Sequence, residues 1–375
     1  MRVAPAAETT FIDIEAFGID RRILAWRIPA TGARDRPGAA SPQRRQPPKG
    51  MATRPKILKK NDAEVEEQDR VGKLCVRYPY RAIPRHNNGF TMRRLTLIPL
   101  LLILFGFACA ARADPQWLTL PPTPHLPQPE RSGYAPIDKI KIWYAVFGHG
   151  APVILLHGGL ANSNYWGDLV PVLAPHYRVI VMDSRGHGRS TRDVQPYGYD
   201  LMAADVLGLM DFLHVKKGAI VGWSDGAILG LDIAIHHPDR LTKLFAFAAN
   251  SDPSGVKDIS QSPVFEAYIA RAANEYKKLS PTPTEYQSFL AQITKMWNTQ
   301  PNWTAQDLRA IKVPTWIVDA DHDEAIKREN TLLMADNIPN SGLLILPQVS
   351  HFAFLQDPQQ FDESVLHFLI HVKGD

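Results

Sequence analysis

The chain has 375 residues, of which 45% are hydrophobic and 21% charged, so it can bury a sizeable core and is not disordered along its whole length. Its two cysteines exclude a disulfide scaffold and most cysteine-ligated metal sites. The 42 basic and 38 acidic residues make the chain mildly basic. This excess lies near the N-terminus, so it does not indicate nucleic-acid binding by the whole chain.

Residues 1–91 carry the basic excess, with 18 basic and 10 acidic side chains, and are rich in Arg and Pro over 34–48. They show little amphipathic periodicity. We expect either translation that begins upstream of the true start at Met92, or a disordered cytoplasmic tail. A basic nucleic-acid-binding arm is the weaker alternative, because basic residues are not interleaved with aromatic ones.

Residues 92–113 have the three parts of a secretory signal peptide. Arg93 and Arg94 precede an apolar run over 95–108, and small residues flank a cleavage site that ends at Ala113. The sequence therefore predicts export to the periplasm or medium after cleavage near Ala113. An uncleaved signal-anchor or a buried core helix are the alternatives, and a lipoprotein box around Cys109 is a weaker one. The mature chain, 114–375, would hold 21 basic and 28 acidic residues and no cysteine.

The mature region alternates predicted strands and helices. A Pro-rich, extended lead-in covers 114–136. The predicted strands cover 139–147, 152–156, 177–182, 219–223, 241–249, 313–319 and 343–346, and the predicted helices cover 166–173, 199–213, 227–237, 325–337 and 358–371. Most of these strands are unbroken apolar runs, which indicates a parallel sheet buried on both faces. We predict one doubly wound α/β domain over 137–375.

One stretch interrupts this alternation. Residues 251–311 are helical in pattern and rich in Tyr and Trp, which predicts a helical lid inserted between two late strands. The alternative is a long helical connection with an aromatic core. If the aromatic residues face a pocket, Trp297 and Trp303, together with Trp223, are candidates for binding an apolar substrate.

A G-x-S-x-G pentapeptide lies at residues 222–226, between a buried strand and a helix. In this context it is typical of a nucleophile elbow, where a tight turn exposes the serine hydroxyl. Gly222 and Gly226 supply the lack of bulk that the turn needs. Ser224 is therefore the candidate nucleophile, and the alternative is a serine that caps a helix.

His351 follows the last predicted strand and is the candidate general base for Ser224. A carboxylate that orients this histidine should follow a neighbouring strand. The acidic run over 319–324 supplies four acids, of which Asp323 is favoured over Asp321 because of its place on the loop. A calcium loop is disfavoured, because Glu324 stands where that loop needs glycine.

His-Gly-Gly at residues 157–159 ends an early strand. Small residues there let a backbone N–H approach a substrate oxygen. The N–H groups of Gly159 and Asp225 are predicted to form an oxyanion hole, with Leu160 as the alternative to Gly159. We interpret the side chain of His157 as structural.

Together these motifs resemble the α/β-hydrolases, in particular their lidded serine ester-hydrolase branch, over about 137–372. The matching segments are the H-G-x turn at 157–159, D-x-R-G-x-G-x-S at 183–190, the elbow at 222–226, the acid at Asp323 and the histidine at His351. The order Ser, Asp, His is also the family's order. The resemblance implies an acyl-enzyme mechanism with a Ser224–His351–Asp323 triad that acts on a small ester substrate without a cofactor or metal.

The chain departs from the family pattern in a few places. Ala320 and Ser350 replace common glycines, and Asp225 follows the nucleophile where Met or Gln is usual. We expect the Asp225 side chain to point away from the site. A serine nucleophile argues against the dehalogenase and epoxide hydrolase branches. Lactone, carbon–carbon, amide and perhydrolysis chemistry remain alternatives, as does a catalytically silent binding protein. Neither nucleic acid nor a stable membrane partner is expected, unless the signal segment is retained.

Overall fold

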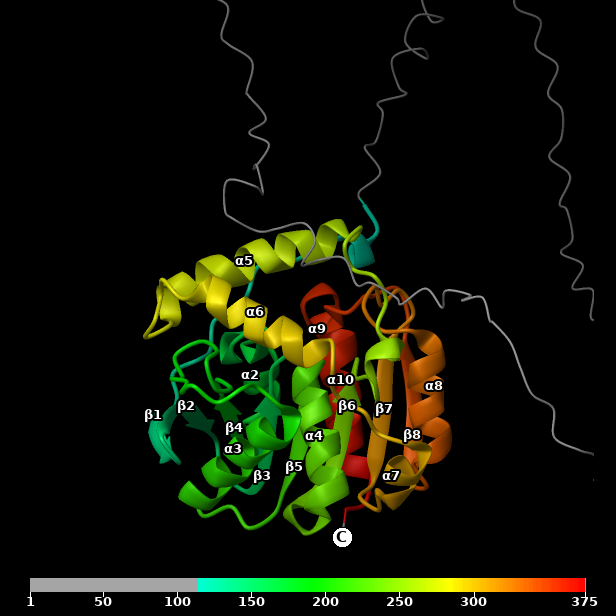
Figure 1. Ribbon diagram of the computed structural model, residues 1–375. Coiled ribbons are helices and arrows are strands. Elements are labelled where there is room, and N and C mark those ends of the chain that lie inside the picture. The colour runs from blue at the N-terminus through cyan, green and yellow to red at the C-terminus, as the bar shows by residue number, and fades with distance from the viewer. Residues whose placement is uncertain (1–113, 375) are drawn as a thin grey trace, which may run out of the picture. The chain divides into compact units, whose positions relative to one another are not determined.

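The computed structural model describes residues 114–374. Within them, eight strands form one sheet in the order β1-β2-β4-β3-β5-β6-β7-β8 (Figure 1). Strands β3 to β8 run parallel, whereas β1 and β2 are antiparallel to their neighbours. The strands are β1 (Arg131–Ile137), β2 (Ile140–Phe147), β3 (Ala151–Leu156), β4 (Tyr177–Met182), β5 (Gly218–Trp223), β6 (Leu241–Phe247), β7 (Thr315–Ala320) and β8 (Ser341–Leu346).

Helices cover both faces of this sheet. One face carries α3 (Tyr199–Phe212), α4 (Asp225–His236), α7 (Ala305–Ala310) and α8 (Arg328–Asn337). The other carries α2 (Leu169–Leu173), α9 (Ala353–Gln356) and α10 (Pro358–His371). The predicted doubly wound α/β architecture is therefore confirmed.

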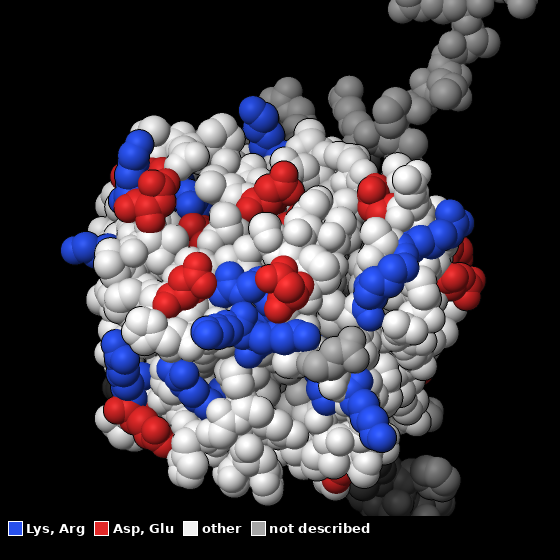
Figure 2. All heavy atoms as spheres, turned by 90° about the horizontal axis from the view of Figure 1, so that it is seen from below, with Lys and Arg blue, Asp and Glu red and all other residues white. Residues whose placement is uncertain are grey.

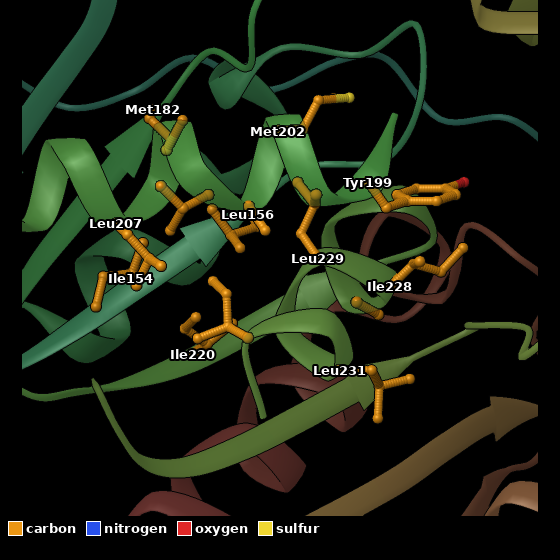
Figure 3. Close-up of a cluster of buried hydrophobic side chains, with 14 of the residues drawn as sticks. Ile154, Leu156, Met182, Tyr199, Met202, Leu207, Ile220, Ile228, Leu229 and Leu231 are labelled. Carbon is orange, nitrogen blue, oxygen red and sulfur yellow. The ribbon is translucent and has the colours of Figure 1, made fainter. Parts of the chain in front are cut away.

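The side chains of β3 show why its sequence is an unbroken apolar run. Val153 and Leu155 belong to the core on one face, while Ile154 and Leu156 belong to the core on the other. Figure 3 shows the second of these cores, where side chains of β3 and β5 meet those of α3 and α4. Because both faces are buried, no alternation with polar residues is needed.

Strand β1 lies almost entirely inside the stretch predicted to be a lead-in. The predicted start of the domain at residue 137 is therefore wrong, because the sheet already begins at Arg131. β1 pairs with β2 along its whole length, from Arg131 opposite Val146 to Ile137 opposite Ile140. Pro136 is tolerated because β1 is an edge strand, where one row of backbone groups needs no partner. Gly133 and Pro136 are residues typical of loops, so the sequence of β1 does not show the alternation expected of a strand.

The predicted helical insertion between β6 and β7 is present but shorter than residues 251–311. It consists of α5 (Pro263–Leu279) and α6 (Tyr286–Trp297). These helices lie across one end of the sheet (Figure 1). By contrast, α7 packs against α4 and α8 and belongs to the helical layer on one face of the sheet. That the insertion moves as a lid stays a prediction.

An N-terminal strap, residues 115–125, ties α5 to the rest of the domain. Both terminal nitrogens of Arg271 on α5 donate hydrogen bonds to the strap, to the carbonyls of Pro121 at 2.6 Å and Leu120 at 2.8 Å. At the other end of the strap, the Trp117 ring stacks on His322 with a centroid distance of 4.0 Å. The extended lead-in is thus a structural brace rather than a free linker.

The predicted signal peptide over 92–113 and the segment over 1–91 lie outside the described residues. Within residues 114–374, the helices are all too short or too polar to cross a bilayer. The face opposite the α5–α6 insertion mixes basic and acidic side chains rather than forming a field of one sign (Figure 2).

Candidate active site

Ser224 stands at a sharp turn between β5 and α4. Its φ of 54° and ψ of −120° are strained for a residue with a side chain. The turn needs glycine on both sides: a Cβ on Gly222 would lie 2.4 Å from the carbonyl oxygen of Gly226, and one on Gly226 would lie 2.1 Å from that of Leu156. The turn therefore places Ser224 directly before α4, where it lines a pocket.

His351 lines the same pocket, and its ring is held from behind by Asp323. Nδ1 of His351 lies 2.8 Å from Oδ2 of Asp323, and both side chains are buried. The other oxygen of Asp323 accepts the backbone N–H groups of Ala325 and Ile326, each at 2.7 Å. Ser224 and His351 both line the pocket, and among the described residues no hydrogen bond joins Oγ of Ser224 to Nε2 of His351.

The carboxyl–imidazole contact shifts both pKa values. Burial opposes the ionisation of Asp323, but the opposing charge and hydrogen bond of His351 prevail and lower its pKa. Burial likewise opposes the protonation of His351, yet the nearby carboxylates, Asp323 first among them, raise its pKa above 6.5. The carboxylates around His351 therefore favour the protonated imidazole.

The other acids of the 319–324 run have different surroundings. Asp321 is partly exposed and lies 3.9 Å from His322. Asp319 accepts a hydrogen bond from the Thr331 hydroxyl at 2.7 Å. Glu324 accepts the backbone N–H of His351 at 3.1 Å, and burial followed by the charge of Asp323 raises its pKa to about 7. Glu324 was not predicted to support the loop that carries His351. Its position next to Asp323 is the only feature of the sequence that indicates this role.

Two backbone N–H groups border Ser224. In the part of the chain that the structure describes, neither Gly159 nor Asp225 donates its N–H to a protein acceptor, and both residues line the pocket. Gly159 has no room for a side chain, because a Cβ there would lie 2.4 Å from the Trp297 ring. His157 is buried; its Nε2 accepts the N–H of Ser184 at 3.0 Å, and burial lowers its pKa. These contacts agree with the structural role expected for His157.

The Asp225 side chain does not point away from the site, contrary to the expectation. Its Oδ1 accepts the Tyr199 hydroxyl at 2.9 Å, and the Trp297 Nε1–H lies 2.9 Å from both carboxylate oxygens. Burial raises the pKa of Asp225 to about 6, although both donors act to lower it. The carboxyl group turns inward because α3 and α6 place these two donors beside it.

The pocket has a volume of about 100 Å³ and is mainly apolar. Trp223 and Trp297 line it, as predicted, but Trp303 does not: it packs against the hydrophobic core of one sheet face. The α5–α6 insertion forms much of the wall. Its contribution is Phe265, Tyr268, Ile269, Leu290, Thr294 and Trp297.

Comparison with known proteins agrees with this architecture. The family model for the alpha/beta hydrolase fold matches residues 151–277, which run from the start of β3 into α5. This protein is an α/β-hydrolase fold protein. The match includes the turn at 157–159 and the elbow at 222–226.

Two curated relatives of this chain act on different kinds of substrate, and one solved structure shares its fold. The 2-hydroxy-6-oxo-6-(2'-aminophenyl)hexa-2,4-dienoic acid hydrolase of Metapseudomonas resinovorans is 27% identical, covering 60% of this chain and 86% of its own. The pimeloyl-[acyl-carrier protein] methyl ester esterase of Aeromonas hydrophila is 26% identical, covering 60% and 97%. The meta-cleavage product hydrolase CumD of Pseudomonas fluorescens superposes with a TM-score of 0.57 at 20% identity, covering 63% and 97%. The two curated relatives support a hydrolase, and the superposition supports the fold.

Proposed function

We propose that this α/β-hydrolase is a serine hydrolase that cleaves a carboxylic ester of a small, mainly apolar substrate. The observation that carries the proposal is that Ser224, on its strained turn, shares a pocket with a histidine whose far nitrogen is bound by Asp323 at 2.8 Å. A buried Asp–His pair beside a half-buried serine in the same pocket is the arrangement that activates a weak oxygen nucleophile.

Each residue of the site has its own role in the proposed ester hydrolysis. Nε2 of His351 takes the hydroxyl proton as Oγ of Ser224 attacks the ester carbonyl. Asp323 holds the imidazole in the required tautomer and stabilises its charged form. The N–H groups of Gly159 and Asp225 bind the oxyanion of the tetrahedral intermediate. His351 then protonates the departing alcohol. In the second half, it deprotonates a water that releases the acid from Ser224.

The walls of the pocket support a small apolar acyl group. Its volume is about 100 Å³, and Trp223, Phe265 and Leu290 are among the residues that line it. Apolar contacts of this kind favour burial of hydrocarbon over hydration. The similarity to a methyl ester esterase supports an ester as the bond that is cleaved.

Hydrolysis of a carbon–carbon bond is the second candidate, and the similarity to the Metapseudomonas hydrolase favours it. Lactone and amide hydrolysis would use the same residues. These reactions differ from ester hydrolysis in the leaving group that His351 must protonate, so a panel of substrates separates them. A binding protein without catalysis is the remaining alternative.

A panel of p-nitrophenyl esters of increasing acyl length, assayed beside several lactones, tests the proposal. We expect turnover of short acyl esters and a loss of about 10⁴-fold or more in kcat for Ser224→Ala, because removal of the nucleophile leaves only the oxyanion hole and substrate binding. Unchanged turnover in Ser224→Ala would contradict the assigned nucleophile. No turnover by a well-folded wild type would move the assignment to a carbon–carbon or amide substrate.

A further inference from the structure

The residue after the nucleophile places a carboxyl group inside the substrate pocket. Asp225 is only 5% exposed and lines the cavity. The groups that donate hydrogen bonds to it, the Tyr199 hydroxyl and the Trp297 indole N–H, are both neutral. The pocket-lining residues include no lysine or arginine. The carboxylate is therefore stabilised mainly by dipoles, and among the residues that line the pocket only His351 can supply a positive charge.

This carboxyl group lies close to the reacting centre. Oδ2 of Asp225 is 2.6 Å from the position that a Cβ on Gly159 would occupy. Gly159 and Asp225 themselves supply the two N–H groups proposed to bind the oxyanion. Ser224 and Asp225 line the same pocket of about 100 Å³, so an acyl group bound to Ser224 shares this pocket with the Asp225 carboxyl group. In so small and buried a site, the charge of a substrate matters.

We propose that Asp225 selects substrates by charge: the pocket accepts neutral and cationic acyl groups and rejects those that carry a carboxylate. This inference rests on the proposed ester hydrolysis and names the substrate class. An anionic acyl group would lose its hydration and meet a second negative charge in a pocket whose walls contain no lysine or arginine. A cationic acyl group would instead gain an ion pair with Asp225.

The size of the effect follows from electrostatics. Two like charges several ångströms apart in a site of effective dielectric constant about 20 change a rate by about 100-fold. Replacing Asp225 with Asn removes the charge but keeps an oxygen that can accept the Tyr199 and Trp297 hydrogen bonds. Charge can thus be separated from shape.

The test compares two methyl esters of similar length, neutral methyl pentanoate and anionic monomethyl glutarate, through the ratio of their kcat/KM values. At pH 8 we expect the wild type to prefer the neutral ester by about 100-fold. Asp225→Asn should reduce this ratio by about tenfold or more. Because the result is a ratio, a loss of rate common to both esters cancels.

A cationic ester tests the other half of the proposal. Methyl 4-(dimethylamino)butanoate is compared with its neutral analogue, methyl 5-methylhexanoate. We expect the wild type to hydrolyse the cationic ester at least as well as the neutral one, and Asp225→Asn to reverse this order. Glu275→Gln is the matched control: Glu275 is held by Thr123 and Asn162 outside the pocket, so its loss should leave both ratios unchanged.

The pH dependence of the preference gives a further test. The groups around Asp225 that titrate are Tyr199 on α3, Tyr268 on α5 and His351. The two tyrosines stay neutral because burial raises each pKa, and ionisation of His351 affects both esters alike. With the pKa of Asp225 at about 6, the preference for methyl pentanoate over monomethyl glutarate should increase from pH 5 to 7.5 by more in the wild type than in Asp225→Asn, whose profile records the titration of the glutarate carboxyl group alone.

Three results would overturn the charge selection. They are a wild-type preference below about threefold at pH 8, an unchanged ratio in folded Asp225→Asn, and a pH dependence of the ratio that is the same in both proteins. If no ester is hydrolysed, the proposed function fails separately. Tryptophan fluorescence can then compare binding of pentanamide with that of anionic glutaramate, and equal binding would overturn the selection itself.

Discussion

At the scale of single residues, local motifs predicted which side chains meet in the pocket but not how each of them is oriented. The turn at 222–226 constrains Ser224 through its own backbone, so five neighbouring residues were enough to identify it. The inward orientation of Asp225 depends on Tyr199 and Trp297, which lie 26 and 72 residues away along the chain. Contacts over such separations leave no local signal, and the prediction that Asp225 points outward was wrong for this reason.

The pairing of Asp323 with His351 leads to a prediction at this scale. Asp323→Asn should lower kcat by about 10³- to 10⁴-fold, because the imidazole loses its orienting acceptor. The general base must be unprotonated, so kcat/KM of the wild type should fall as the pH drops through a pKa raised above 6.5. Removing the Asp323 charge should move that inflection to lower pH, which a pH–rate profile measures.

Asp321→Asn provides the control for this prediction. Asp321 is about as near in sequence to the same strand end, but its partly exposed carboxylate lies beside His322 rather than His351. We expect kcat within about twofold of wild type, since surface substitutions rarely matter. A large loss in Asp321→Asn with full activity in Asp323→Asn would contradict the assignment of the acid.

At the scale of elements, buried parallel strands were predictable and edge elements were not. Strands buried on both faces, such as β3 and β5, are continuous apolar runs with distinct ends. Strand β1 is largely exposed and contains Gly133 and Pro136, so its pattern resembles that of a loop. Trp303 was assigned to the pocket from its place in the insertion, but the chain turns back to the sheet before it is reached.

The strap over 115–125 provides a prediction for this scale. Arg271→Ala removes two hydrogen bonds from a charged donor to the strap carbonyls. We expect the free energy of unfolding to fall by about 1–3 kcal/mol, as measured by urea denaturation. Lys278→Ala, on the exposed end of the same helix, should change it by less than about 0.5 kcal/mol. Equal effects of the two changes would show that the strap contacts do not stabilise α5.

At the scale of the whole molecule, sequence order and strand topology together bring the site into being. Ser224, Asp323 and His351 follow β5, β7 and β8 in turn. The carboxyl ends of parallel strands meet at one edge of the sheet, which is where open α/β sheets bind their ligands. This convergence was predictable from the alternating pattern. The composition of the pocket wall was not, because the α5–α6 insertion approaches it from above the sheet and its register depends on tertiary packing.

The proposed mechanism requires Ser224 to form a covalent acyl-enzyme. Its most direct test is active-site labelling with a neutral alkyl fluorophosphonate, followed by mass spectrometry of the digested protein. If Ser224 is the nucleophile, we expect a single adduct on the peptide that contains Ser224, complete loss of ester hydrolysis on labelling, and no adduct in Ser224→Ala. An adduct on another residue, or hydrolysis that persists in fully labelled protein, would contradict it.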